Sequence, residues 1–110
     1  MNEKIKNELD NIVKTLVNTG IVSRIILFGS CARGDETPDS DIDLCVLTPL
    51  KNKRPIELIV DFRLKLMDIK TMPLDIFAYN QDAFYDRATN RLASFHREIA
   101  ETGVLLYDRV

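Results

Sequence analysis

The chain has 110 residues, of which 45% are hydrophobic and 29% are charged, and its formal net charge at pH 7 is −2. That length is close to the usual size of one domain, so we expect a single domain over residues 1–110 with a real hydrophobic core. A slightly acidic chain argues against bulk electrostatic binding of nucleic acid. No apolar run approaches the roughly 18 residues of a membrane span, and the N-terminus has no signal-peptide pattern, so we expect no membrane association and a cytoplasmic location.

Apolar periodicity, glycines and prolines divide the chain into alternating helices and strands. The first helix is expected to stop at Gly20, and a short helix is expected to begin at Ser30, whose hydroxyl can cap it. The predicted helices cover residues 2–19, 56–69 and 92–102, and the predicted strands cover residues 24–28, 42–47, 74–79 and 104–107. A short helix or turn is expected around Phe84 and Ala88, and the last strand is expected at an edge. This order predicts a mixed α/β fold in which helices pack on a small sheet.

The two cysteines and the clustered cations are given ordinary structural interpretations. Cys31 and Cys45 are too few and too poorly spaced for a zinc site, so we expect free thiols, with Cys45 in the core. Two groups of cations, one over residues 51–54 and one at Arg87 and Arg91, are interpreted as solvated surface.

The most informative stretch joins a Gly29-Ser30 turn, across a gap of ten residues, to the pair Asp41 and Asp43. The turn follows the apolar strand 24–28, and the carboxylates stand at the start of the next strand. Because strand side chains alternate, Asp41 and Asp43 point the same way and repel each other unless a cation lies between them. A hard divalent cation such as Mg²⁺ is the natural candidate, and a Gly-Ser turn can bind phosphate oxygens beside it. These residues predict metal-assisted handling of a nucleoside triphosphate.

The same residues carry a family resemblance. The motif Gly-Ser-x-Ala-Arg-Gly followed by Ser-Asp-Ile-Asp-Leu, over residues 29–44, resembles the minimal nucleotidyltransferase branch of the DNA polymerase β-like superfamily. That resemblance implies the polymerase β-like nucleotidyltransferase fold and an enzyme that transfers a nucleotide, with ATP as the expected substrate. It implies that Gly29 and Ser30 bind the triphosphate. Arg33 is expected either to assist with phosphate charge or to order the following loop.

Asp75 interrupts an otherwise apolar predicted strand. A carboxylate there either faces solvent or is paired or coordinated, because an isolated buried charge costs several kcal/mol. The residues alone leave these alternatives open. The resemblance implies a third acidic residue on a downstream strand, which makes Asp41, Asp43 and Asp75 the expected catalytic residues and ligands of one or two Mg²⁺ ions.

The resemblance also bears on the acceptor. Larger relatives carry an extra acceptor-binding domain, for which residues 1–110 leave no room. Minimal nucleotidyltransferases are commonly encoded beside a small HEPN-domain protein, so the resemblance implies an antitoxin that transfers AMP to a tyrosine of a HEPN toxin. Two alternatives stay open. One is a non-catalytic partner that masks a toxin, and the other is a small-molecule nucleotidyltransferase of the aminoglycoside type, completed by dimerisation.

Overall fold

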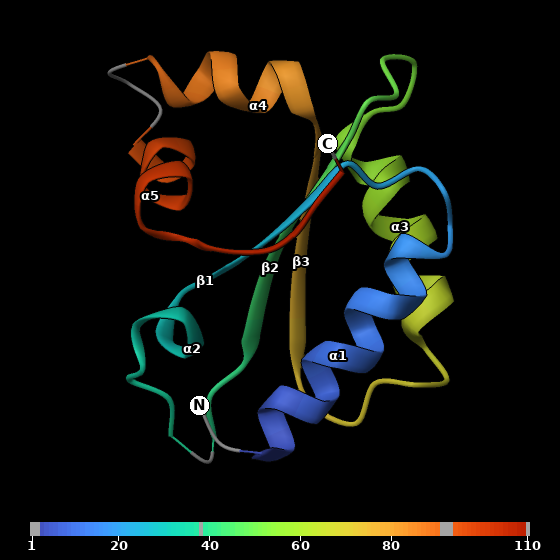
Figure 1. The fold of residues 1–110 in the computed structure, drawn as a ribbon. Coiled ribbons are helices and arrows are strands. Elements are labelled where there is room, and N and C mark those ends of the chain that lie inside the picture. The colour runs from blue at the N-terminus through green and yellow to red at the C-terminus, as the bar shows by residue number, and fades with distance from the viewer. Residues whose placement is uncertain (1–2, 38, 91–93, 110) are drawn as a thin grey trace.

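The computed structural model of the protein describes residues 3–37, 39–90 and 94–109. Helices and strands alternate along most of the chain (Figure 1). In chain order the elements are α1 (Glu3–Val17), β1 (Arg24–Phe28), α2 (Ser30–Arg33), β2 (Ile42–Thr48), α3 (Pro55–Leu66), β3 (Leu74–Asn80), α4 (Gln81–Ala88), α5 (Ser94–Thr102) and β4 (Val104–Asp108).

The four strands form one mixed sheet in the order β3-β2-β1-β4. β1 is antiparallel to both β2 and β4, whereas β2 and β3 run parallel and are joined by a crossover that contains α3. The β2–β3 ladder pairs Ile42 with Leu74 and continues in step to Thr48 and Asn80. Both parallel strands therefore begin at one end of the sheet and finish at the other.

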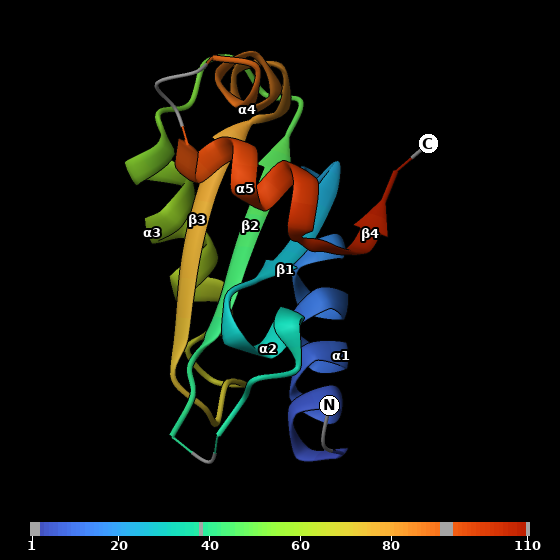
Figure 2. The same cartoon turned by 90° about the vertical axis from the view of Figure 1, so that its left-hand side faces the viewer.

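Helices cover the two faces of the sheet unequally (Figures 1 and 2). On one face, α1 and α3 bury Ile42, Leu44 and Val46 of β2 in the larger hydrophobic cluster. On the other face, Phe84 of α4 and Ile99 of α5 pack on Ile26, Cys45 and Leu47 in a smaller cluster. The alternation of side chains along β2 separates the two cores, because even-numbered residues face one layer of helices and odd-numbered residues face the other.

A buried carboxylate ties α1 to the loop that leads into β3. Glu8 is only 4% exposed, and its Oε2 atom accepts hydrogen bonds from the backbone nitrogen (2.6 Å) and the hydroxyl (3.0 Å) of Thr71. A buried carboxylate is costly unless it is hydrogen-bonded. Thr71 lies three residues before Leu74, the first residue of β3. The contact therefore holds the segment that leads into β3 against the N-terminal half of α1.

The predicted elements are confirmed, with differences at their ends. β2 and β3 each extend one residue further than expected, and α3 covers residues 55–66 instead of 56–69. The expected side-chain cap at Ser30 is wrong, because Gly29 occupies the cap position and Ser30 is already the first helical residue, with no side-chain capping bond. Residue 2 of the first predicted helix, residues 92–93 of the last one, and Arg91 lie outside the described residues.

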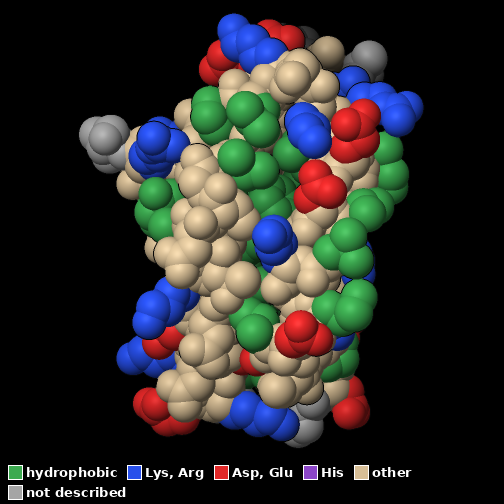
Figure 3. All heavy atoms as spheres, turned by 90° about the vertical axis from the view of Figure 1, so that its right-hand side faces the viewer, with side chains coloured by type: hydrophobic (Ala, Val, Ile, Leu, Met, Phe, Trp, Pro, Cys, Tyr) green, Lys and Arg blue, Asp and Glu red, His purple; other side chains and the backbone are tan. Residues whose placement is uncertain are grey.

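Hydrophobic side chains also reach the surface on the side that carries α1 and α3 (Figure 3). Along α3 and just beyond it, Ile56, Val60, Leu64 and Met67 are each about half exposed or more. Their spacing places them on one stripe, opposite the buried Leu58, Phe62 and Leu66. Within the described ranges, no helix is both long enough and apolar enough to cross a bilayer.

The two faces of α3 allow a matched test of the core. Leu66→Ala should lower the free energy of unfolding by about 2–5 kcal/mol, because a fully buried side chain is replaced by a cavity. Leu64→Ala makes the same chemical change on the same helix at a side chain that is 60% exposed, and should change stability by less than about 0.5 kcal/mol. Urea unfolding followed by circular dichroism measures both values. Equal losses for the two variants would contradict the assignment of faces.

Candidate active site

The turn that ends β1 depends on Gly29. Its backbone has φ 76° and ψ −157°, a region that is essentially restricted to glycine. A Cβ atom at this position would overlap the Oδ2 atom of Asp43. Gly29 is therefore required for two reasons: its backbone conformation, and the close passage of the turn beside the Asp43 carboxylate.

Asp43 and Asp75 are neighbours across the sheet. Asp43 pairs with Asp75 in the parallel β2–β3 ladder and with Phe28 in the antiparallel β1–β2 ladder. Paired residues on adjacent strands project to the same face, and such strands lie about 4.8 Å apart. The structure therefore places the two carboxylates side by side next to the Gly29 turn, on the face that also carries α4 and α5. Asp75 is exposed and Asp43 is half-buried.

Asp41 lies one residue before β2 and is exposed. The thiol of the buried Cys31 on α2 approaches the Asp41 carbonyl oxygen, with 3.5 Å between sulfur and oxygen, and so links α2 to the start of β2. Burial and nearby acidic groups raise the pKa of Cys31, and burial raises the pKa of Cys45 to about 12. Neither thiol is activated as a nucleophile, and the free-thiol prediction is confirmed for both cysteines.

The pKa of the Asp43 carboxyl is raised above its ordinary value of 3.8. Burial is the largest cause, followed by the negative charges of Asp75 and Asp41, while the positive charge of Arg33 acts in the opposite direction. Both unfavourable contributions penalise the charged form of the carboxyl. A bound cation would relieve both of them, so the electrostatics of the site favour a positive ligand.

The donor set fits a hard divalent cation in kind, because Asp41, Asp43 and Asp75 offer only carboxylate oxygens beside a turn that can approach phosphates. Over residues 3–37, 39–90 and 94–109, no three His, Cys, Asp or Glu side chains stand close enough to enclose a metal ion. Mg²⁺ does not need such an enclosure. It is usually held by one or two carboxylates together with water and substrate phosphates. The paired Asp43 and Asp75 meet that requirement, with Asp41 at their edge.

Arg33, at the C-terminal end of α2, contacts the loop that follows it. Its Nε atom donates to Asp35 at 3.2 Å, and both side chains are more than half exposed. An exposed pair of this kind contributes about 1 kcal/mol at most, so it orders the loop only weakly. Because Arg33 also lowers the pKa of Asp43, its charge acts on the carboxylate cluster as well.

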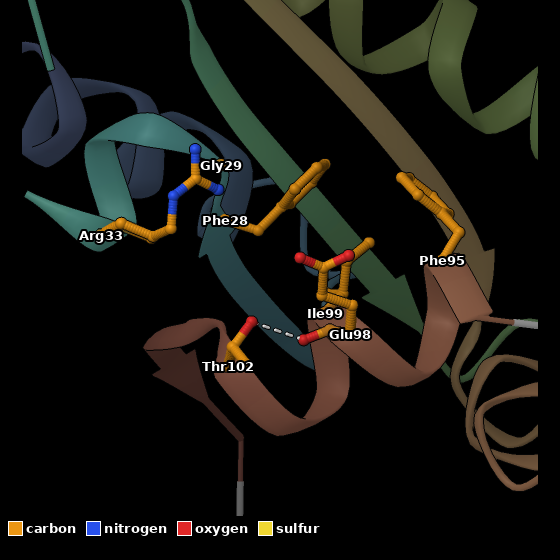
Figure 4. Close-up of a pocket in the computed structure, with 8 residues that line it drawn as sticks. Phe28, Gly29, Arg33, Phe95, Glu98, Ile99 and Thr102 are labelled. Carbon is orange, nitrogen blue, oxygen red and sulfur yellow. Dashed lines mark hydrogen bonds between the residues drawn. The ribbon is translucent and has the colours of Figure 1, made fainter. Parts of the chain in front are cut away.

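A cleft of about 210 Å³ lies between α2 and α5, over the end of β1 (Figure 4). Phe28 and Gly29 form its base and Arg33 stands on the α2 side. From α5 it is lined by Phe95, Glu98, Ile99 and Thr102, and the Thr102 hydroxyl donates to the Glu98 carbonyl oxygen at 2.7 Å. The cleft therefore begins at the Gly29 turn and extends away from it along α5.

Three aromatic rings form an apolar wall beside the carboxylates. The ring centroids of Phe28, Phe77 and Phe95 lie between 5.3 and 5.8 Å apart, a spacing typical of favourable aromatic contacts. Phe28 pairs with Asp43, and Phe77 lies two residues after Asp75 on the same face of β3. The wall therefore begins beside Asp43 and continues over the same face of the sheet to α5.

Sequence reasoning placed the α5 helix but missed its part in the cleft. The four lining residues of α5 are spaced i, i+3, i+4 and i+7, which puts them on one helical face. That spacing was available in the sequence. Nothing local, however, indicated that this face would meet α2, more than sixty residues earlier in the chain.

Comparisons with known proteins identify the class of enzyme, and a mixed sheet with a Gly-Ser turn and paired aspartates on one face is consistent with nucleotidyl transfer. The family model described as "Nucleotidyltransferase domain" matches residues 6–106. A candidate protein adenylyltransferase of Methanocaldococcus jannaschii is 31% identical over 105 residues, which cover 96% of this chain and 97% of the relative. The chain belongs to the nucleotidyltransferase domain family, and we describe it as a nucleotidyltransferase.

Solved structures support the same fold. A crystal structure of a candidate nucleotidyltransferase from Sulfolobus solfataricus matches with a TM-score of 0.62 at 20% identity, over 94% of this chain and 79% of that chain. A crystal structure of a toxin–antitoxin with AMP-PNP matches with a TM-score of 0.52 at 22% identity, over 89% of this chain and 72% of that chain. These likenesses confirm the expected nucleotidyltransferase fold.

Gly29 and Gly34 provide a matched pair of variants. Both have φ close to 77°, but a Cβ atom at Gly34 meets nothing within 4 Å. Gly34→Ala should cost about 1–2 kcal/mol of stability, from backbone strain alone. Gly29→Ala should cost more and should also weaken Mg²⁺-ATP binding, because its Cβ atom displaces the Asp43 carboxylate. Urea unfolding and calorimetric titration measure the two effects, and equal ATP affinities would exclude a role for the Gly29–Asp43 approach.

The raised pKa of Asp43 gives a prediction with a definite sign. A carboxyl whose pKa is higher in the folded than in the unfolded state contributes stability below its unfolded pKa, and that contribution is lost as pH rises through the folded pKa. Asp43→Asn should therefore stabilise the cation-free protein at pH 7, and the gain should shrink as pH falls toward 3.8. Urea unfolding in EDTA across pH 3.5–7.5 measures it. The exposed Asp68→Asn is the control, and a gain that persisted at the lowest pH would contradict the charge explanation.

Proposed function

We propose that the chain transfers AMP from ATP to a side chain of a partner protein, in a reaction that depends on Mg²⁺. The pairing of Asp43 with Asp75 beside the Gly29 turn is the observation that carries this proposal. The relative from M. jannaschii supports a protein acceptor through its name as a candidate protein adenylyltransferase. The toxin–antitoxin structure with AMP-PNP supports an adenine nucleotide and a protein partner.

Each site residue has a role in this proposal. Gly29 lets the backbone approach the triphosphate, and Ser30 binds its outer phosphate oxygens. Asp41, Asp43 and Asp75 are the residues that would hold Mg²⁺. When bound, the ion would neutralise the phosphate charge and lower the free energy of charge build-up at the reacting oxygens.

The reaction requires an acceptor hydroxyl positioned beside the α-phosphorus and one group that accepts its proton. The acceptor hydroxyl oxygen forms a bond to the α-phosphorus while the bond from that phosphorus to the β-phosphate oxygen breaks, and pyrophosphate leaves. Asp75 is the exposed member of the carboxylate pair, so it accepts the proton from the incoming hydroxyl. Asp43 pairs with Phe28 and lies deeper, where it would help to hold the metal ion.

The partner that we propose is a HEPN-domain toxin, with this chain as its antitoxin. A tyrosine hydroxyl on a protein surface can reach a carboxylate pair that is exposed on one side, as Asp75 is. The toxin–antitoxin neighbour supports this choice. Nucleotidyl transfer needs carboxylates that can hold a metal ion. The presence of Asp41, Asp43 and Asp75 therefore favours transfer over a protein that only masks the toxin.

The direct test is transfer of label from α-³²P-ATP with Mg²⁺ to the product of the adjacent gene, which we expect to be a HEPN-domain protein. Wild type should label the acceptor, and Asp43→Asn should reduce labelling about a hundredfold or more, since it removes an expected metal ligand at nearly constant volume. Asp68→Asn, an exposed aspartate beyond the end of α3, should label as wild type does.

The remaining outcomes separate the alternatives. Full activity of Asp43→Asn would overturn the site assignment. Binding of Mg²⁺-ATP without labelling of the HEPN protein would overturn the acceptor, and labelling of an aminoglycoside in its place would identify the small-molecule class. If the wild type neither bound Mg²⁺-ATP nor labelled an acceptor, the result would favour a non-catalytic partner that acts by masking a toxin.

A further inference from the structure

A second cleft, of about 630 Å³, opens at the other end of the sheet from the carboxylates. It lies where β2 and β3 finish, between the loop over residues 49–54 and α4 (Figures 1 and 2). Asp43 is five residues before the end of β2, so roughly 17 Å of strand separates the two sites. Ligands of open α/β sheets commonly bind outside the carboxyl ends of parallel strands, which is the position of this cleft.

Four cations line this basic cleft, although the chain as a whole is acidic. Lys51, Lys53 and Arg54 come from the loop after β2, and Arg87 comes from the last turn of α4. The sequence presents them as two separate groups, each of which is ordinary surface on its own. The fold brings them to one concave site because β2 and β3 are adjacent and parallel.

The two sides of the basic cleft are fastened together by Asn80. Its Nδ2 atom donates to the carbonyl oxygen of Leu50 at 3.0 Å, which holds the basic loop. Its Oδ1 atom accepts from the backbone nitrogen of Ala83 at 2.9 Å, which caps α4. One side chain therefore sets the distance between the loop cations and α4, so the cleft is built before any ligand arrives.

The positive charge of the basic cleft is only partly neutralised. Arg54 pairs with Glu57 at 2.9 Å and Lys53 approaches Asp61 at 3.7 Å, and all four side chains are well exposed. Lys51 and Arg87 form no ion pair with any residue that the structure describes. Arg87 also acts on its surroundings, since its charge helps to lower the pKa of His96 and opposes the burial that raises the pKa of Tyr79.

Apart from Asn80, the rest of the lining is mainly apolar. Tyr79, Pro55 and Ala83 complete the wall, and Tyr79 packs its ring on Phe84 with centroids 5.8 Å apart. Concave sites of several hundred Å³ with apolar walls and a few charged groups are typical of small-molecule binding. An extended nucleic acid is disfavoured by the net charge of −2, because such ligands need broad positive surfaces.

We propose that the basic cleft binds a small phosphorylated ligand, with its phosphate groups on Lys51, Arg54 and Arg87 and its apolar part against Tyr79. Lysine and arginine are the usual side-chain ligands of phosphate, and Arg87 can form two parallel hydrogen bonds to it. The site is separate from the carboxylates and does not rest on the proposed transfer reaction.

The test is a titration of the ¹⁵N-labelled full chain with sodium tripolyphosphate in EDTA, followed by amide NMR shifts. Saturable shifts are expected over residues 51–54 and 80–87, at the basic cleft. Without a divalent cation, the carboxylates repel a polyphosphate, so shifts near Gly29 should be smaller. A parallel titration with ATP tests the Tyr79 wall. Tighter binding of ATP than of tripolyphosphate supports the proposed apolar contact, and equal or weaker binding would overturn that contact.

Matched variants make the outcome decisive. Arg87→Gln and Lys51→Gln should each weaken tripolyphosphate binding about tenfold or more, the loss of a charge-assisted contact, whereas Arg63→Gln on α3 should leave it unchanged. Shifts that do not saturate, or equal affinities for the Arg87 and Arg63 variants, would overturn the proposal. Saturable binding of an acidic peptide with none of tripolyphosphate would also overturn it, and would assign the cleft to a protein partner.

Discussion

The in-step pairing of β2 with β3 is the constraint on which the rest of the structure depends. A shift of one residue would turn every side chain of a strand to the opposite face, moving Asp43 from the site into the core. Burial excludes that shift, because Leu44 and Val46 are fully buried against α1 and α3, and Leu74 and Ile76 lie with them. The hydrophobic core on one face of the sheet thus fixes the position of the carboxylates on the other.

The same pairing brings the negative charges of Asp43 and Asp75 together, and the positive charge of Arg33 offsets only part of the resulting repulsion. Arg33 is the one positively charged group among the causes that shift the pKa of Asp43, and its lowering effect is outweighed by burial and two acidic neighbours. Burial and the neighbouring charges that raise the pKa of Asp43 disfavour its charged form, and a bound cation would favour that form, as the proposed Mg²⁺ site requires. The glycine-only backbone of Gly29 adds strain at the same place.

Sequence patterns predicted most of the fold and chose the residues at the centre of the candidate site, and the failures of these patterns have a common cause. Apolar runs located all four strands, and the motif located Gly29, Asp41 and Asp43, because these features are local in the chain. The Ser30 cap was wrong since the close approach of Asp43 requires Gly29 at the cap position. The α5 wall and the union of residues 51–54 with Arg87 were not predicted, because both arise from contacts between segments that are distant in sequence.

Parallel strands also explain why the charges of this chain are arranged as they are. Because β2 and β3 start together and finish together, residues at their starts gather at one end of the sheet and residues after their ends gather at the other. Asp41, Asp43 and Asp75 lie at or beside the starts, and the ends lead into Lys51 and, through α4, into Arg87. A net charge of −2 therefore conceals a strong polarity along the sheet. Screening in physiological salt acts over about 8 Å, so the electrostatic potentials at two sites roughly 17 Å apart are almost independent of each other.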